Sequence, residues 1–314
     1  MAEIVTITAN PALDLSTEAP ALLPDHKLRC TAPRVQPGGG GVNVSRAIAA
    51  LGGASRALVA YGGHTGEHLM QLLAGEGLGV ESLGVGHTTR QSMSVRDAAS
   101  GLQYRFMIPG APWSERDCDT ARDAIRAAVT PGALLIPSGS LPPGMPFDFF
   151  LTLNDEVAAQ GGRMIIDTSG PALERAAKGG AGLWCLRMDT VEAEELAGRR
   201  LHSLDDMARM ASGLRAAGAG EIVMIAAGAQ GTVVACEGWL GLTRPPVVVP
   251  HSLIGAGDSF IGAFALAISR GEDPVDACAR GTAAAASAVT MPGTDLCARD
   301  DVDRFYRQVT RHAL

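Results

Sequence analysis

The sequence predicts an α/β sandwich, in which helices cover both faces of a mainly parallel β-sheet. Two observations predict it: short aliphatic runs recur along the chain, and segments with a helical spacing of apolar residues lie between them. Strands that are apolar on both faces are typical of parallel sheets, because the connecting helices cover each face. The expected strands are Ile4–Thr8, Ala133–Ile136, Arg163–Ile166, Leu183–Leu186, Ile222–Ile225 and Thr232–Ala235.

Helices are expected where apolar residues recur every three or four positions, since such residues share one helical face. The sets with this spacing are Val44/Ile48/Leu51, Leu69/Leu72/Leu73 and the run from Ala121 to Val129.

Two segments, residues 16–36 and 91–108, interrupt the alternation of aliphatic runs and helices. They are richer in polar residues and have a period of two, as in Ser92–Val95 and Gln103–Met107. This period is typical of strands with one exposed face. We expect short strands outside the main sheet that form a small lid. No linker rich in Ser, Pro or charge divides the chain, so residues 1–314 are predicted to form one domain with this lid.

Composition excludes some classes of function. The net charge is −7 and no block of Lys or Arg stands out, which argues against nucleic acid as a partner. No window reaches the ~20 apolar residues of a membrane span, and the N-terminus lacks a signal sequence, so a cytoplasmic protein is expected. The six cysteines are scattered without a C-x-x-C pair, which favours reduced thiols over disulfides or a metal site.

A glycine run, Gly38–Gly41, leads into a predicted helix. Without side chains, its backbone can approach a ligand closely and direct N–H groups at it. Asn43 lies in the first helical turn, where its amide could hydrogen-bond a sugar hydroxyl. The run does not match the dinucleotide fingerprint G-x-G-x-x-G, because positions 43 and 44 are Asn and Val. A flexible turn before a helix is the alternative interpretation.

A second glycine turn, Gly255-Ala256-Gly257-Asp258, precedes the almost wholly apolar segment Ile261–Ile268. A helix this apolar is expected to be buried, so that its N-terminal amides and positive dipole end face an anion. A phosphoryl group in transfer suits such a site, since its catalysis is mainly positioning and charge stabilisation. Asp258 could accept the proton of an attacking hydroxyl, or it could simply cap the helix.

Further polar residues fit an anionic sugar ligand. Asp14 follows the first strand, at the sheet edge where α/β proteins bind ligands, although a lone Asp there is often a turn residue. The lid segments carry a set of cations suited to phosphate, namely Lys27, Arg29, Arg90 and Arg105. The motifs H-E-x-x-H, G-x-S-x-G and G-x-x-x-x-G-K-[ST] are absent.

The two glycine-rich elements, Gly38–Ala47 and Gly255–Asp258, resemble the two signatures of the ribokinase-like (PfkB) sugar kinases. Matching segments run nearly end to end and include Lys27–Pro33, Tyr104–Phe106, Ser138–Gly144 and Gly293-Thr294. The resemblance implies a three-layer α/β/α sandwich with a β lid. It also implies an ATP-dependent kinase of the bacterial 6-phosphofructokinase type, which phosphorylates fructose 6-phosphate at C1 to fructose 1,6-bisphosphate.

The resemblance also implies roles for individual residues. Asp258 would be the general base, and the amides of Gly255, Ala256 and Gly257 would form the anion hole. The implied ligands of the sugar hydroxyls are Asp14, Gly39 and Asn43. The implied contacts of the 6-phosphate are Lys27, Arg90, Arg105 and Ser140.

On the nucleotide side, the resemblance implies Mg²⁺ with ATP, K⁺ as a monovalent cation, and a homodimer formed through the lid strands. Glu192 occupies the Glu of the family's N-x-x-E motif and would organise Mg²⁺ through water. The implied nucleotide contacts are Arg187, Asp189, Gly228, Gly231 and the Ala283–Ala288 region.

The chain departs from the family pattern near the expected nucleotide. Arg187-Met188-Asp189 stands where close relatives have Lys-Pro-Asn, which places a carboxylate near the ATP phosphates and removes a constraint on the turn. His251–Ile254 carries fewer hydroxyls than is usual before the G-A-G-D turn, and Ala12 replaces a Ser. Three alternatives stay open: a tagatose 6-phosphate kinase, a fructose 1-phosphate kinase, or a sugar-phosphate-binding protein with weak catalysis.

Overall fold

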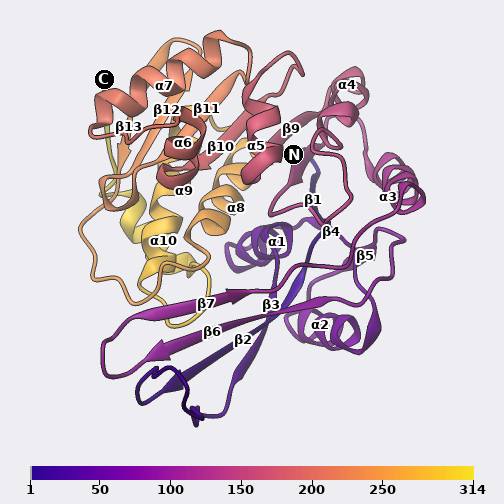
Figure 1. The fold of residues 1–314 in the computed structure, drawn as a ribbon. Coiled ribbons are helices and arrows are strands. Elements are labelled where there is room, and N and C mark those ends of the chain that lie inside the picture. Colours follow the sequence, from indigo (N-terminus) through magenta and orange to yellow (C-terminus); the bar gives the residue numbers. More distant parts are fainter. Residues whose placement is uncertain (1) are drawn as a thin grey trace.

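The computed structural model describes residues 2–314, which fold around a ten-stranded sheet (Figure 1). The strand order is β14-β13-β12-β11-β10-β9-β8-β1-β4-β5. Neighbours from β5 to β11 pair in parallel, and β11, β12, β13 and β14 pair antiparallel in turn. The strands are β1 (Ile4–Thr8), β4 (Arg56–Val59), β5 (Val80–Ser82), β8 (Leu134–Pro137), β9 (Arg163–Asp167), β10 (Cys185–Asp189), β11 (Ile222–Ala226), β12 (Thr232–Cys236), β13 (Trp239–Arg244) and β14 (Thr310–Ala313).

Helices cover both faces of this sheet, and each face has its own core. One face carries α3 (Glu115–Ala128), α4 (Leu151–Ala159), α5 (Gly170–Ala177), α6 (Thr190–Ala197) and α7 (Leu204–Ala216). The other carries α1 (Gly40–Ala50), α2 (Gly63–Gly75), α8 (Ala256–Ser269), α9 (Pro274–Val289) and α10 (Arg299–Tyr306). The predicted α/β sandwich with a mainly parallel sheet is therefore confirmed.

β1 shows why both layers are needed. All five of its residues are buried, with Val5 and Ile7 in one core and Ile4 in the other. A strand that alternates its side chains between two apolar layers cannot leave either face in water. Similarly, every residue of α8 from Ser259 to Ser269 is buried.

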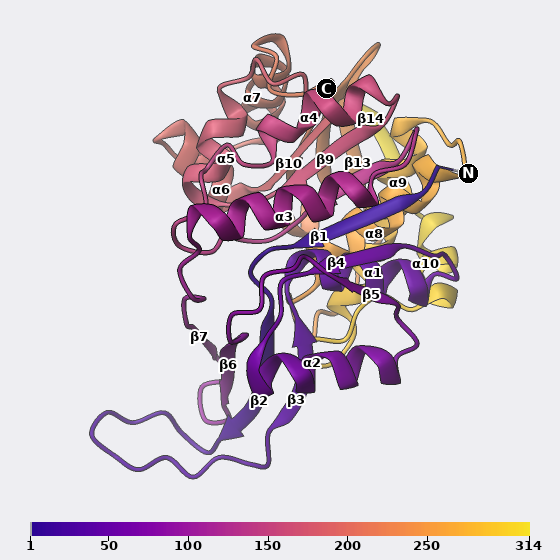
Figure 2. The same ribbon diagram turned by 90° about the vertical axis from the view of Figure 1, so that its right-hand side faces the viewer.

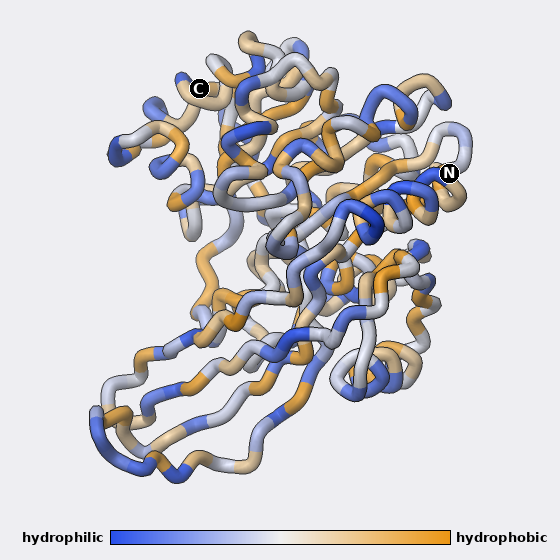
Figure 3. Tube along the Cα trace, turned by 45° about the vertical axis from the view of Figure 1, so that its right-hand side comes forward, coloured by the Kyte–Doolittle hydropathy of each residue, from blue (hydrophilic) through white to orange (hydrophobic). Residues whose placement is uncertain are grey.

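A separate four-stranded sheet, the lid, projects from the sandwich in the order β3-β2-β6-β7 (Figure 2). Its strands are β2 (Ala12–Ala19), β3 (Arg34–Gly38), β6 (Arg90–Asp97) and β7 (Gln103–Met107). Figure 3 shows hydrophilic and hydrophobic residues alternating along them, the pattern that predicted strands here. β2 begins earlier than expected, and residues 20–33 form an irregular connection at the far end of the lid.

The expected strands of the main sheet are all present, with bounds shifted by a few residues except at β1, which is as predicted. The strands β4, β5, β13 and β14 were not predicted. The described helices include none that is both long and apolar enough to cross a membrane.

Candidate active site

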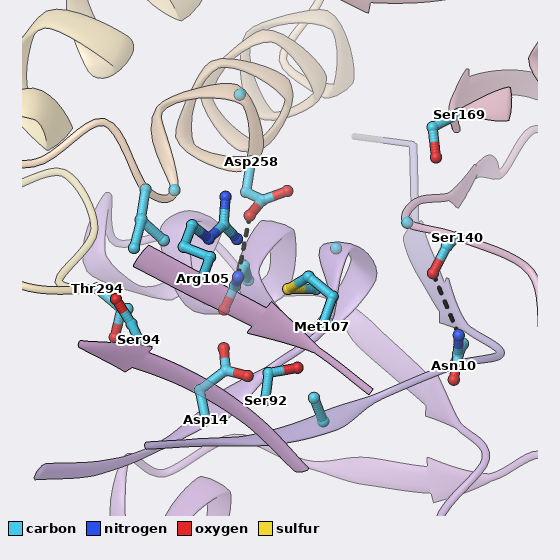
Figure 4. A pocket seen from close by; sticks show the side chains of 18 of the residues that line it. Asn10, Asp14, Ser92, Ser94, Arg105, Met107, Ser140, Ser169, Asp258 and Thr294 are labelled. Carbon is cyan, nitrogen blue, oxygen red and sulfur yellow. Dashed lines mark hydrogen bonds between the residues drawn. The ribbon is translucent and has the colours of Figure 1, made fainter. Parts of the chain in front are cut away.

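A cavity of about 420 Å³ lies between the lid and the carboxyl ends of β1, β8, β9 and β10 (Figure 4). The sandwich contributes residues from the strand ends and from the first turn of α8, and the lid contributes residues of β2, β6 and β7. The polar residues that line it are Asn10, Asp14, Ser16, Asn43, Arg90, Ser92, Ser94, Arg105, Ser140, Asp167, Ser169, Arg187, Glu192, Asp258 and Thr294.

The first glycine run lets α1 begin against the strand end of β1. Gly39 has φ 119°, a conformation that side chains disfavour. A Cβ atom on Gly41 would lie 2.5 Å from the carbonyl oxygen of Ile7 and 2.6 Å from the hydroxyl of Thr8. Glycine at these two positions therefore allows the turn to lie directly over β1 and beside the cavity.

Asn43, in the first turn of α1, hydrogen-bonds the carboxylate of Asp258. Its Nδ2 donates to Oδ2 of Asp258 at 2.9 Å, and its Oδ1 accepts from Nη1 of Arg46 at 3.2 Å. Because Arg46 can only donate, it fixes the orientation of the Asn43 amide. The two glycine-rich elements, far apart in sequence, thus meet at one side-chain contact, drawn as the dashed line at Asp258 in Figure 4.

Asp258 lies at the start of α8 but does not cap it. The N-cap is Gly255, with φ 77°, and no side chain within residues 2–314 caps this helix. The first amides of α8 therefore remain without side-chain acceptors at the cavity wall, as a site for anions requires. The capping interpretation of Asp258 is not supported by this geometry.

The environment of Asp258 raises the pKa of its carboxyl group to about 7. Burial is the main cause, and the nearby carboxylate of Asp167 adds to it, while Asn43 and Arg187 act in the opposite direction. A base with a pKa near neutrality is deprotonated often enough, and binds the proton strongly enough, to take a proton from a hydroxyl.

A buried ion pair lies beside this turn. Nη1 of Arg187 is 3.0 Å from Oδ1 of Asp167, and the two side chains are 13% and 11% exposed. Ser138 donates a further hydrogen bond to Asp167. A Cβ atom on Gly257 would lie 3.0 Å from the guanidinium nitrogens of Arg187, so glycine there lets the cation approach the first turn of α8.

Asp189 and Glu192 form a reciprocal cap at the start of α6. Asp189 accepts from the amide of Glu192 at 2.9 Å, and Glu192 accepts from the amide of Asp189 at 2.7 Å. Glu192 also lines the cavity, and burial raises the pKa of its carboxyl group to about 7. Since Asn and Asp cap helices about equally well, the Asp189 carboxylate can cap α6 as the Asn of the expected motif would.

On the lid side, Asp14 lies between three arginines. Burial raises the pKa of its carboxyl group, and Arg90, Arg105 and Arg46 oppose the shift. Arg90 is held by the hydroxyl of Ser92 and by two backbone carbonyl groups. Arg105 points into the cavity from β7 (Figure 4).

Most of the predicted site residues meet at this cavity, including Asp14, Gly39, Asn43, Arg90, Arg105, Ser140, Arg187, Glu192, Gly255, Gly257 and Asp258. The others lie outside its lining. Ala256 is the first residue of α8, and Asp189 is an N-cap. Lys27 is exposed in the irregular connection of the lid, whereas Gly228 and Gly231 flank a short turn after β11.

Sequence reasoning did not single out Asp167 or Ser169, or the serines of β6. A signal existed for Asp167 and for the two serines of β6. Asp167 is the polar residue that ends an aliphatic run, as Asp14 follows another. Ser92 and Ser94 share the strand face of Arg90, because side chains alternate along a strand.

The model of the pfkB family of carbohydrate kinases matches residues 2–301, and this chain belongs to that family. It is 38% identical, over 99% of its length and 100% of the relative's, to the ATP-dependent 6-phosphofructokinase isozyme 2 of Escherichia coli. Two crystal structures of the E. coli phosphofructokinase-2 superpose on it with TM-scores of 0.91 and 0.90. The first is a complex with potassium and is 38% identical to this chain. The second is a complex with fructose-6-phosphate and is 37% identical. Each match covers 98% of this chain and 99% of the other.

Proposed function

We propose that this protein transfers the γ-phosphoryl group of ATP to the C1 hydroxyl of fructose 6-phosphate, giving fructose 1,6-bisphosphate and ADP. The observation that carries the proposal is the position of Asp258. Its carboxylate lies at the amide end of a buried helix and faces the same cavity as Asp14, Arg90 and Arg105. One cavity therefore offers a base, an anion site and cations for a second phosphate.

In this mechanism Asp258 accepts the proton of the C1 hydroxyl as the oxygen attacks the phosphorus. The hydrogen bond from Asn43 orients the carboxylate toward the cavity. The amides of Gly255, Ala256 and Gly257 stabilise the charge on the transferring group, because they point at it before reaction and need no rearrangement.

The sugar phosphate is assigned to the lid side. Arg90 and Arg105 supply positive charge for the 6-phosphate, and Ser140, which accepts a hydrogen bond from Asn10 at 3.1 Å, supplies a hydroxyl. Asp14, Gly39 and Asn43 line the same cavity and are proposed to bind the sugar hydroxyls. Lys27 is proposed as a further contact of the 6-phosphate, which requires residues 20–33 of the lid to approach the bound sugar phosphate.

The nucleotide side holds residues that fit Mg²⁺ with ATP. Glu192 presents carboxylate oxygens, the ligands that Mg²⁺ prefers, together with phosphate and water. In the described chain no three His, Cys, Asp or Glu side chains gather into a metal site. Mg²⁺ bound with ATP would neutralise the charge of the phosphates, and Glu192 would hold it through water. Arg187 is proposed as the cation for the transferring group, with Asp189, Gly228 and Gly231 farther along the nucleotide.

Steady-state kinetics with MgATP and a panel of phosphosugars tests this function. Fructose 6-phosphate is expected to give the highest kcat/KM, above fructose 1-phosphate and tagatose 6-phosphate. Preference for another sugar would reassign the substrate, and binding without turnover of any would leave only the sugar-phosphate-binding alternative. Assays in KCl and in NaCl test K⁺ activation, which is proposed from the potassium complex of the E. coli protein.

We also propose that two copies of this chain associate through their lids. β7 is an edge strand of the lid sheet, and all five of its residues are exposed. Tyr104 and Phe106, 43% and 48% exposed, share the face of β7 opposite to Arg105 and thus point away from the cavity. An unprotected edge strand with apolar side chains is unusual in a monomer, because it can pair with other chains.

A charge on this face should dissociate the dimer. Phe106→Glu is expected to sediment as a monomer at a protein concentration at which the wild type is a dimer, because a carboxylate cannot be buried unpaired. Phe147→Glu is the matched control, since Phe147 is 57% exposed on the sandwich. A wild type that sediments as a monomer, or a dimer that survives Phe106→Glu, would contradict the proposal.

A further inference from the structure

The lid and the first turn of α8 line opposite sides of the cavity, and one loop makes contacts with both. This loop, Gly293–Ala298, follows α9 and contributes Thr294 to the cavity lining. Thr294 lies beside the lid strands in Figure 4. The contacts of this loop on either side explain how the lid is held relative to Asp258.

On the lid side, the loop is bonded to β3. The hydroxyl of Thr294 donates to Oε1 of Gln36 at 2.5 Å, and Nε2 of Gln36 donates to Asp295 at 3.1 Å. Both ends of the Gln36 amide are therefore used. Gln36 and Thr294 are 5% and 7% exposed, so the hydrogen bond between them is shielded from water, while the bond to Asp295, 27% exposed, is partly shielded. Arg34, also on β3, adds two hydrogen bonds to the Asp295 carboxylate, at 2.6 and 3.2 Å.

On the opposite side, the same loop is attached to α8. The amide of Cys297 donates to the hydroxyl of Ser259 at 3.3 Å. The side chain of Leu296 lies against Gly255, where a Cβ atom would be 2.6 Å from Cδ2 of Leu296. The loop thus contacts the first turn of α8 on both sides of Asp258 in the sequence.

Gln36 also connects to the sugar side through the lid itself. It is the cross-strand partner of Asp14 in the β2–β3 pairing. Its side chain does not line the cavity, so any effect it has on the reaction passes through the position of β2 and Asp14. The opposite edge of the lid, β7, has no such attachment to the loop among the contacts of the described residues.

From these contacts we infer that Gln36, Thr294 and Asp295 form a latch that sets the separation of Asp14 from Asp258, with Gln36 and Asp295 as positioning residues. The latch fixes the β3 edge of the lid relative to the first turn of α8. The two hydrogen bonds of the buried Gln36 amide matter most, because Arg34 is 53% exposed and ion pairs at the surface stabilise little. The inference rests on the proposed kinase function for its kinetic consequence.

The test compares Gln36→Leu, which removes both bonds at similar size, with Asp295→Asn and with the control Asp301→Asn. Asp301 pairs with Arg304 on α10 and leaves the latch intact. Gln36→Leu is expected to lower kcat and raise the KM for the sugar phosphate, reducing kcat/KM about ten- to a hundred-fold, as for misplaced reacting groups. The KM for MgATP is expected to stay within about two-fold, since binding lost on one side of the cavity leaves the other intact. Asp295→Asn is expected to show a smaller change in the same direction.

Hydrogen exchange without substrates provides a readout that does not depend on activity. In Gln36→Leu and Asp295→Asn, the amides of β2 and β3 should exchange faster, by at least about ten-fold in the first, while those of α10 do not change. Asp295→Asn keeps the side-chain shape near the surface and decides the matter if Gln36→Leu does not fold. Unchanged exchange of the lid amides in both variants would overturn the latch, whatever the enzymatic activity. A wild type that turns over no phosphosugar would count against the proposed kinase function and not against the latch.

Discussion

Asp258→Asn is expected to lower kcat by about 10²–10⁴-fold, the usual contribution of a general base. The amide keeps the size of the side chain but cannot accept the proton of the C1 hydroxyl. Sugar-phosphate binding, measured by calorimetry, should change little, because Arg90 and Arg105 lie on the lid. Asp301→Asn serves as the control. A kcat of Asp258→Asn within ten-fold of the wild type would rule out the role of general base, because that loss is smaller than the usual contribution of such a base.

The same variant should change the pH dependence of stability. Folding raises the pKa of the Asp258 carboxyl group from the ordinary 3.8 to about 7, so the native state binds a proton more tightly than the unfolded state. Its contribution to stability is fully present below the ordinary pKa and is lost as the pH rises through about 7. The Tm of Asp258→Asn relative to the wild type should therefore increase over this pH range. A constant difference would mean that the carboxyl group titrates normally.

Arg187→Met should be the most destabilising of the site variants. It leaves the carboxylate of Asp167, 11% exposed, with only the hydroxyl of Ser138 as a side-chain partner. Removing one member of a buried ion pair costs about 3–5 kcal/mol of unfolding free energy, because the remaining charge is desolvated without compensation. Chemical denaturation measures this loss.

Arg187→Met should also move the acid limb of kcat/KM to higher pH. Arg187 lowers the pKa of Asp258 and Asp167 raises it, so Asp167→Asn should move the limb to lower pH. General loosening of the site would not give shifts of opposite sign. Shifts in the same direction would contradict the arrangement of charges described above.

The double variant Arg187→Met/Asp167→Asn is the control for stability. Since neither charge is then left buried alone, it should be more stable than Arg187→Met by itself. Additive losses of stability would indicate that the two side chains do not act as a pair.

The sequence predicted the buried part of the sheet well, for a physical reason. β1, β8, β9, β11 and β12 are apolar on both sides, and their aliphatic runs are visible without any tertiary information. In contrast, all four residues of β14 are exposed, and this edge strand is held by its pairing with β13 and by an ion pair between Arg311 and Asp276 of α9. Such a strand has no hydrophobic pattern from which it could be predicted.

The same holds for the site: residues marked by a local motif could be predicted, and contacts between distant segments could not. Glycine turns and residues at strand ends were visible in the sequence. The hydrogen bond between Asn43 and Asp258 was not, because the two residues lie far apart in the chain. Asp167 was missed because its importance comes from Arg187, on the adjacent strand β10. Asp189 was read as a nucleotide contact, and its capping of α6 depends on local geometry.

The burial of α8 has an evolutionary consequence. From Ser259 to Ser269 this helix offers no position at which a new side chain could project into water. Substitutions there must fit an existing packing arrangement, so the phosphoryl-transfer turn at its start tolerates little drift. The lid strands instead alternate between the cavity and solvent, and single replacements on β6 or β7 change what the cavity accepts without disturbing the core. Divergence toward other phosphosugars should therefore accumulate in the lid.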